Sequence, residues 1–321
     1  MTMPARPHIA LLGLGLMGAS LARALKARRL VRRLSGYAPS AATRARARAL
    51  GLVDEVVRAP EACVRGADFV FLNMPVGQME ASARAIASAL KPGAIVTDVG
   101  SVKRAPARLV RRALPAHIVY VPGHPIAGTE QTGPDAGFAE LFENRFCVLT
   151  PRRGTERRAL MAVRRLWEQM GARVIEMTPA AHDRLLALTS HLPHLVAYGL
   201  TATARRSRQS HKAIVNFSAG GFRDFTRIAA SDPVMWRDIF LHNRDAVLAE
   251  LARFEAQLKL LRTAIEQDDG AALLASFQSV RRLRREIVAA GQEEAAPDFG
   301  RRRASVKPRR ASVKPRRAAR P

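Results

Sequence analysis

A short segment near the start of the chain constrains the fold more than any other part of the sequence. It begins with the apolar run Ile9–Leu12, which has the length of a strand, and continues through Gly13, Gly15 and Gly18. In a dinucleotide-binding unit the first glycine allows a tight turn, the second lets the backbone approach a pyrophosphate, and the third lets the helix pack on the strand. The helix N-terminus adds free N–H groups and a positive dipole end. The segment therefore predicts a site for a nicotinamide dinucleotide.

Two other interpretations compete for this segment. A glycine-rich turn also occurs in strand-to-helix units that bind no nucleotide. A secretory signal is not expected, because the glycines interrupt the apolar stretch and no small-residue cleavage site precedes a mature domain. The stretch is also too short for a bilayer, which needs ~20 apolar residues. Residues 20–30 have the apolar spacing of a helix with one buried face, which favours the nucleotide site.

The bulk composition limits the class of protein. A chain of 321 residues is long enough for two domains. Its two cysteines, Cys63 and Cys147, are far apart, so no disulfide framework is expected and a cytoplasmic location fits best. No membrane segment and no metal site are predicted.

The net charge of +26 would ordinarily suggest a nucleic-acid partner, so its distribution matters. Ten Lys/Arg and no acid lie in residues 301–321, which leaves +16 for residues 1–300, spread over Ala/Arg-rich helices. No specific nucleic-acid site is therefore predicted. The tail repeats Ala-Ser-Val-Lys-Pro-Arg-Arg at 304–310 and 311–317, and residues 293–321 are expected to be disordered. Nonspecific polyanion binding and an inert solubilising role both remain open for the tail.

Strand-like and helix-like segments alternate through the first half of the chain. Strands are predicted at 34–37, 69–74, 95–99, 118–121, 147–149 and 174–177, and helices at 41–50, 80–90, 103–114 and 156–170. This alternation predicts an α/β fold, a Rossmann-like doubly wound parallel sheet, in a dinucleotide-binding domain of residues 1–178. Residues 179–292 contain only helical periodicities, at 182–188, 194–204, 233–261 and 270–289, and are predicted to form an all-α substrate and dimerisation domain.

One helical stripe suggests how that second domain assembles. Apolar residues recur at spacings of three and four along residues 248–261: Leu248, Leu251, Phe254, Leu258 and Leu261. A second copy of the chain often covers such a stripe, so a homodimer is expected. A self-contained helical bundle is the alternative.

Candidate catalytic groups follow the predicted strands, where parallel sheets bind ligands. The segment Asp98–Lys103 presents the hydroxyl of Ser101, and the segment 123–130 presents the imidazole of His124 beside Thr129 and Glu130. Histidine suits proton transfer near neutral pH, because its unperturbed pKa is ~6.5. Without that role, His124 is a structural loop residue, Ser101 an N-cap of the next helix, and Lys103 a solvated first-turn residue.

The helical half contributes two more polar segments. Residues 190–194 hold Ser190, His191 and His194, but no further ligand supports a metal site, and Pro193 predicts a break in the helix. A polar contact to the substrate is therefore predicted for His194, with capping or packing as the alternative. Arg227 offers a planar fork to a carboxylate, with a surface pair to Asp224 as its alternative.

Taken in order, these segments resemble one enzyme family. They are Gly13-Leu-Gly15-Leu-Met-Gly18-Ala-Ser20, Asp98-Val-Gly-Ser101-Val-Lys103, Gly123-His124-Pro-Ile-Ala-Gly-Thr129-Glu130, Ser190-His-Leu-Pro-His194 and Phe222-Arg-Asp224-Phe-Thr-Arg227-Ile-Ala. The series is similar to the prephenate/arogenate (cyclohexadienyl) dehydrogenases of tyrosine biosynthesis, over residues 8–290. The resemblance implies oxidative decarboxylation of prephenate to 4-hydroxyphenylpyruvate, or of arogenate to tyrosine, with hydride transfer to NAD(P)+. It also implies an active site in the cleft between the two domains.

The resemblance also implies roles for individual residues. His124 takes the proton of the ring hydroxyl, and Ser101 assists at the hydroxyl and at the nicotinamide. Arg227 holds a substrate carboxylate, His194 lines the pocket, and Trp236 reaches toward the neighbouring subunit's site. Asp224 and Glu130 form a gating ion-pair network with that arginine. The full set expected to bind substrate is Arg227, His194, Ser190, Thr129, Glu130, Asp224 and Trp236. The set expected to bind cofactor is Gly13, Gly15, Leu16, Met17, Gly18, Ala38, Ser40, Pro75 and Ser101.

One departure concerns the cofactor. An acidic residue ~20 residues past the glycine turn usually binds the ribose 2′-hydroxyl of NAD. Residues 36–40 contain no acid, and Arg44 and Arg46 follow. NADP is therefore expected to be tolerated or preferred.

Two other functions are compatible with parts of the sequence. A 3-hydroxyacid dehydrogenase shares the glycine motif but depends on a lysine early in the helical domain, where this chain has His191 and His194. A non-catalytic dinucleotide-binding protein with a polyanion-binding tail is the third possibility.

Overall fold

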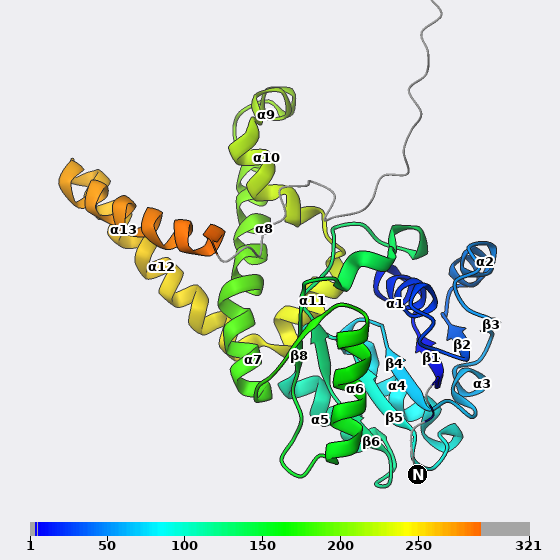
Figure 1. Cartoon of the computed structure of the whole chain (residues 1–321). Helices are drawn as coiled ribbons and strands as arrows, with labels where there is room; N and C mark the ends of the chain where they lie inside the picture. Colours follow the sequence, from blue (N-terminus) through cyan, green and yellow to red (C-terminus); the bar gives the residue numbers. More distant parts are fainter. Residues whose placement is uncertain (1–3, 5, 290–321) are drawn as a thin grey trace, which may run out of the picture.

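The computed structural model describes residue 4 and residues 6–289. Its main sheet contains six parallel strands: β1 (His8–Leu12), β2 (Arg33–Tyr37), β3 (Glu55–Val57), β4 (Phe69–Leu72), β5 (Ile95–Asp98) and β6 (Val119–Val121). Their order is β3-β2-β1-β4-β5-β6, so the direction of winding reverses between β1 and β4 (Figure 1). This is the doubly wound order of a Rossmann fold, in which ligands bind beyond the carboxyl ends of the strands. The predicted fold class is confirmed.

Helices cover both faces of this sheet. Side chains of β1 alternate between the faces, with Ile9 and Leu11 in one buried cluster and Ala10 and Leu12 in the other. The first cluster includes residues of α1 (Leu16–Ala27), α2 (Ala41–Ala49) and α6 (Arg157–Gln169). The second includes residues of α3 (Pro60–Val64), α4 (Met79–Ile86) and α5 (Arg104–Ala113). Strands buried on both sides explain the continuous apolar runs of the sequence.

The last two predicted strands do not extend this sheet. They are β8 (Phe146–Leu149) and β9 (Arg173–Glu176), and with β7 (Gly123–Pro125) they form a separate three-stranded sheet. β7 runs antiparallel to β8, whereas β8 and β9 are parallel. Pro122 separates β6 from β7 and has no N–H to donate to a neighbouring strand, so the main sheet ends there. The prediction of a single continuous parallel sheet through residue 177 was wrong.

Smaller differences occur inside the nucleotide-binding half. The short elements β3 and α3 were not predicted, because three to five residues carry too little periodicity. α1 begins at Leu16 rather than at Ser20. Cys63 and Cys147 are both buried and unbonded to each other, as expected.

The remaining elements are helical. They are α7 (Pro179–Leu186), a π-helical turn (Ala187–His191), α8 (Leu192–Arg205), α9 (His211–Phe217), α10 (Gly220–Thr226), a 3-10 turn (Arg227–Ala230), α11 (Pro233–His242), α12 (Arg244–Glu266) and α13 (Gly270–Ala289). The chain stays helical through Pro193, so the predicted break is wrong. Pro193 lies at the first positions of α8, directly after the π-turn, where a missing N–H is tolerated.

The predicted helix at 233–261 is interrupted instead at Asn243. This residue ends α11 and precedes α12, with φ of −113° and ψ of 28°. Its side-chain amide donates to the carbonyl of Asp183 (2.8 Å) and lies 3.1 Å from Nδ1 of His191. The interruption therefore joins α7 and the π-turn to the start of α12.

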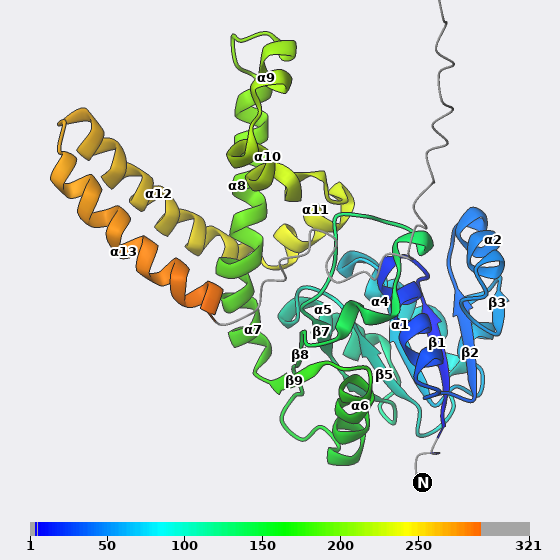
Figure 2. The same ribbon diagram turned by 45° about the horizontal axis from the view of Figure 1, so that its top comes forward.

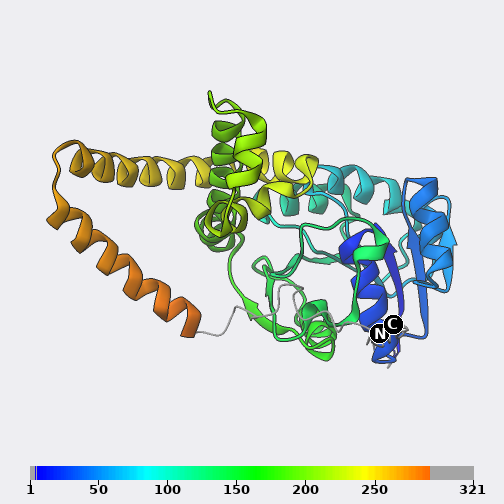
Figure 3. The ribbon, with the colours of Figure 1, turned by 90° about the horizontal axis from the view of Figure 1, so that it is seen from above.

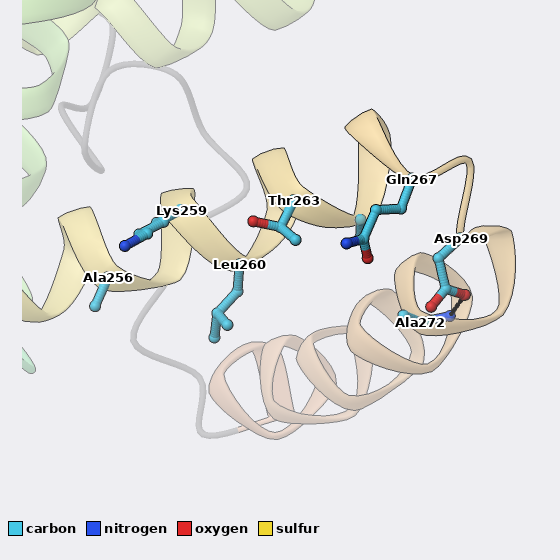
Figure 4. Close-up of a pocket in the computed structure, with 8 residues that line it drawn as sticks. Ala256, Lys259, Leu260, Thr263, Gln267, Asp269 and Ala272 are labelled. Carbon is cyan, nitrogen blue, oxygen red and sulfur yellow. Dashed lines mark hydrogen bonds between the residues drawn. The ribbon is translucent and has the colours of Figure 1, made fainter.

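Helices α12 and α13 form a hairpin that projects away from the sheet (Figures 1–3). Many large apolar side chains on it are exposed: Leu248, Leu258, Leu260, Ile265, Leu274, Phe277, Val280, Leu283, Ile287 and Val288. A groove between the two helices has a volume of about 500 Å³. Figure 4 shows residues that line it, such as Leu260 and Thr263. Within residues 6–289, no helix is long and apolar enough to cross a membrane. The predicted tail, residues 293–321, lies outside the described residues.

Candidate active site

The glycine turn after β1 has the geometry that a dinucleotide needs. Gly13 has a φ of +102°, and a Cβ on it would lie 2.4 Å from the backbone oxygen of Asn73. A Cβ on Gly18 would lie 1.9 Å from the Gly13 oxygen, so only glycine lets α1 approach the turn this closely. Gly15, the N-cap of α1, has open space where a Cβ would project, and no side chain caps the helix. The turn therefore fits a pyrophosphate.

The other residues predicted to contact the cofactor lie along the same edge of the sheet. Leu16 and Met17 open α1, Ala38 follows β2, and Pro75 follows β4. Ser40 is the N-cap of α2, and its hydroxyl accepts a hydrogen bond from the backbone N–H of Thr43 (3.3 Å).

An arginine lies over the β2–α2 connection. Nη1 of Arg44 donates to the carbonyls of Ala38 and Pro39, each at 2.7 Å. Arg46 instead pairs with the exposed Asp135. Of the two arginines singled out in the sequence, Arg44 is the one held beside the end of β2.

A buried polar cluster ties the two catalytic segments together. The ammonium group of Lys103 contacts Asp98 and donates to the carbonyl of Gly123 (2.5 Å). Asp98 also accepts from the hydroxyl of Tyr120 (2.6 Å) and from the backbone N–H of Gly100 (2.8 Å). Lys103 is only 1% exposed, so the prediction of a solvated first-turn residue is wrong. Its charge is tolerated because a carboxylate and a carbonyl replace water.

His124 lies in a chain of hydrogen bonds that crosses between the two halves of the protein. Its Nδ1 is 2.8 Å from Nε2 of His182, and Nδ1 of His182 is 2.8 Å from Oδ1 of Asp183. Asp183 also accepts from the backbone N–H groups of Lys103 and Arg104, both at 2.8 Å. Asp183 therefore caps α5 from the helical half, and the predicted N-cap role of Ser101 is wrong. Ser101 is half-buried.

The surroundings of His124 keep it neutral. Burial lowers the pKa of His124 well below its ordinary value, and the nearby His182 and Lys103 lower it further. A neutral imidazole has one nitrogen that can accept a proton. Among the described residues, none hydrogen-bonds Nε2 of His124. His124 can thus act as a base near pH 7.

The π-turn and α8 bring aromatic and polar groups to the same region. The ring of His194 stacks on Trp236 of α11, with 3.5 Å between the ring centroids, and His191 meets the same ring edge-on. Nδ1 of His194 lies 2.9 Å from the carbonyl of Ser190. Burial lowers the pKa of His194 to about 4. Trp236 is buried against Val102, so within the single chain it contacts residues of its own site.

Arg227 reaches from the helical half to the loop after His124. Its Nη1 donates to Glu130 at 3.0 Å, and its charge contributes to the low pKa of His194. Asp224, on α10, is exposed and pairs with the adjacent Arg223 at 3.6 Å. Of the predicted network, the structure contains the Glu130–Arg227 pair; α10 ends at Thr226, and Arg227 opens the following 3-10 turn. The hydroxyl of Thr129 accepts from the backbone of Gln131 (3.2 Å).

The comparisons with known proteins identify the family of this site. Residues 21–176 match "Prephenate dehydrogenase, nucleotide-binding domain", and residues 178–279 match "Prephenate dehydrogenase, dimerization domain". The chain is 47% identical to the cyclohexadienyl dehydrogenase of Zymomonas mobilis, over 86% of this chain and 94% of that protein. The chain belongs to the prephenate dehydrogenase family. The prephenate dehydrogenase of Bacillus subtilis is 35% identical over 85% of this chain and 74% of its own length.

A solved member of the prephenate dehydrogenase family has the same overall structure. The enzyme from Aquifex aeolicus, in complex with hydroxyphenyl propionate and NAD+, superposes with a TM-score of 0.82. The two sequences are 34% identical, and the match covers 89% of this chain and all of that one. The resemblance inferred from the five sequence segments is confirmed, and with it membership of an oxidoreductase family.

Several polar residues of this dehydrogenase site were missed by the sequence argument. His182, Asp183 and Asn243 were assigned only to helices, and Tyr120 only to a strand. A signal was available for one pair, because a histidine followed by an aspartate opens the helical half. The hydrogen bonds that hold them join residues 22 to 80 positions apart in the sequence, which a local pattern does not contain.

Proposed function

We propose that this chain oxidatively decarboxylates prephenate to 4-hydroxyphenylpyruvate, and also accepts arogenate to form tyrosine, with NAD(P)+ as hydride acceptor. The observation that carries the proposal is the buried neutral His124, together with the pair that Glu130, in the loop after it, forms with Arg227 of the helical half. Family membership favours this reaction over that of a 3-hydroxyacid dehydrogenase or a non-catalytic nucleotide-binding protein.

A nicotinamide dinucleotide bound at the glycine turn supplies the acceptor for the hydride. Nε2 of His124 accepts the proton of the ring hydroxyl while hydride leaves the same carbon, and returns it to the phenolic oxygen after CO2 departs. Ser101 orients that hydroxyl. Aromatisation of the ring drives the reaction, so the protein mainly supplies orientation, a base and a cationic anchor.

Residues of the helical half hold the substrate. Arg227 binds a substrate carboxylate by exchanging its contact with Glu130 for a contact with the ligand. His194, held by Ser190 and Trp236, presents a neutral ring to the pocket. Thr129 and Asp224 complete the set of residues proposed to bind substrate. Asp224 lies on the exposed surface of α10.

The decisive assay follows reduced cofactor with prephenate and arogenate, each with NAD+ and with NADP+. Turnover with neither substrate would refute the proposed function. Deleting residues 301–321 distinguishes an enzyme from a protein whose function is polyanion binding. The enzyme keeps its turnover after the deletion, whereas a polyanion-binding protein loses most of its salt-sensitive affinity. Prephenate and arogenate differ in one side-chain group, so the ratio of kcat/KM for the two substrates measures which one the enzyme prefers.

Truncating Arg227 should weaken substrate use strongly. Arg227→Ala is expected to lower kcat/KM by about 100-fold, mainly through KM, because a charge-assisted contact worth about 3 kcal/mol is lost. Steady-state kinetics at saturating cofactor measure the change. Arg208→Ala, which removes an exposed charge from the same half, is the matched control. Similar kinetics in the two variants would remove Arg227 from the anchoring role.

The cofactor pocket should accept the 2′-phosphate of NADP+. The loop after β2 presents Arg44 and no carboxylate, so kcat/KM for NADP+ is expected to equal or exceed that for NAD+. Arg44→Ser should lower kcat/KM for NADP+ by about tenfold with less effect on NAD+, and Arg46→Ser is the control. A large preference of the unaltered protein for NAD+ would overturn this expectation.

The same proposal includes a homodimer formed through the helical domain, in the cytoplasm. The exposed apolar residues of α12 and α13 and the match to a dimerization domain support it. Sedimentation velocity measures the mass in solution, and a monomer at micromolar concentration would contradict it.

A further inference from the structure

The hydrogen bonds around His124 determine where its proton lies. Both carboxylate oxygens of Asp183 already accept hydrogen bonds, Oδ1 from the N–H of Lys103 and Oδ2 from the N–H of Arg104. The hydrogen between Asp183 and His182 is therefore carried by Nδ1 of His182. The distance between these two atoms is 2.8 Å, which suits an N–H donor and a carboxylate acceptor.

The hydrogen bond between the two histidines also has a fixed direction. Burial lowers the pKa of His182 below its ordinary value, so a ring protonated at Nδ1 has a lone pair at Nε2. This lone pair accepts from Nδ1 of His124 at 2.8 Å. His124 is then protonated at Nδ1 and unprotonated at Nε2, the nitrogen left for the substrate.

We propose that His182 is a positioning residue that fixes the tautomer of His124, and that Asp183 holds His182 in the orientation this requires. The proposal rests on the assignment of His124 as the base under the proposed function. His124 lies on β7 of the nucleotide-binding half, whereas His182 and Asp183 lie on α7. Residues of the helical half therefore set the tautomer of His124, the base in the nucleotide-binding half.

The neighbouring charges support a neutral pair of rings. The groups that face the two histidines are Lys103 before α5, Asp98 at the end of β5, His191 in the π-turn and Asp183. The ammonium group of Lys103 opposes protonation of both rings. The two rings also meet edge to face, with centroids 5.1 Å apart, which restricts rotation of either one.

A wrong tautomer would present an N–H to the substrate hydroxyl instead of a lone pair. His182→Leu removes the acceptor for Nδ1–H of His124 at similar volume. It should lower kcat by about 100-fold or more, as expected when a catalytic imidazole loses the group that sets its tautomer. KM for prephenate and the Kd of the cofactor should change less than about threefold, because His182 is fully buried and its ring contacts His124 and Asp183. His182→Gln keeps an acceptor oxygen, so its kcat should be at least about tenfold higher than that of His182→Leu.

Nitrogen NMR of protein labelled with 15N-histidine tests the tautomer without any turnover. The His124 signals are assigned by their loss in His124→Asn, and His211→Gln, at the exposed start of α9, controls for the substitution itself. A protonated Nδ1 and an unprotonated Nε2 in the unaltered protein support the proposal, and the reverse pattern refutes it. A folded His182→Leu variant that keeps kcat within about threefold also refutes it. If that variant does not fold, the spectrum of the unaltered protein decides. Absence of turnover beside the expected spectrum would refute the proposed function alone.

Discussion

Replacing His124 with asparagine is expected to lower kcat by at least about 1,000-fold, because a general base contributes on this scale and an amide cannot take the proton. KM should change less than about threefold, since Arg227 and His194 remain to bind the substrate. Steady-state and single-turnover kinetics with prephenate measure both values. His117→Asn, at an exposed position, is the matched control. Full activity of the His124 variant would remove it from the base role.

The pH profile gives a second measure of the same residue. The base works only when neutral, and burial places the pKa of His124 well below 6.5. Activity should therefore persist as the pH falls through 6.5 and decline only at lower pH, where His124 becomes protonated. An acid limb centred near pH 6.5 in the unaltered enzyme would contradict the assignment. The limb is read from kcat/KM, which reports the free enzyme.

The second large effect is on stability. Lys103→Met is expected to lower the free energy of unfolding by about 3–5 kcal/mol, because it leaves the buried carboxylate of Asp98 without its cation. The hydrogen bonds from Tyr120 and Gly100 to Asp98 remain, so part of the cluster survives. Urea denaturation followed by fluorescence at one fixed protein concentration measures the difference.

A lysine at a more accessible position provides the control. Lys26 is 36% exposed at its side chain and pairs with Asp54 at 3.1 Å. Lys26→Met should change the free energy of unfolding by less than about 1 kcal/mol, because water screens an exposed pair. Equal effects of the two substitutions would show that the buried cluster around Lys103 adds no special stability.

The parts of the fold that depend on local pattern could be predicted from the sequence. Gly13, Gly15 and Gly18 each have the surroundings that their spacing indicated, and the strands of the main sheet other than β3 lie where strands were predicted. The partners of β8 and β9 could not be predicted in the same way. An apolar run indicates a strand but contains no information on which sheet the strand joins.

In the candidate site, too, local sequence patterns do not contain the long-range contacts. His124, Arg227 and Glu130 were found because they belong to short motifs, and the structure pairs Arg227 with Glu130, in the loop that follows His124. Lys103 was misread because its position in a first helical turn suggested solvent, whereas Asp98 and Gly123 enclose it. A surface pair of Asp224 with Arg227 was considered from their spacing of three residues. That spacing brings two side chains together on an uninterrupted helix, whereas α10 ends at Thr226.

The π-helical turn at Ala187–His191 has a consequence for the spacing of the sequence on either side of it. A turn of this kind holds one more residue than an α-helical turn. Deleting one residue from it would turn it into an ordinary α-helical turn, and because the wider turn takes up the extra residue, the helix after it would keep nearly the same rotation. His194 would then stay close to the ring of Trp236. The scaffold therefore tolerates a change of one residue in length at this point, whereas the same deletion in the middle of α7 or α8 would rotate the residues beyond it by about 100°.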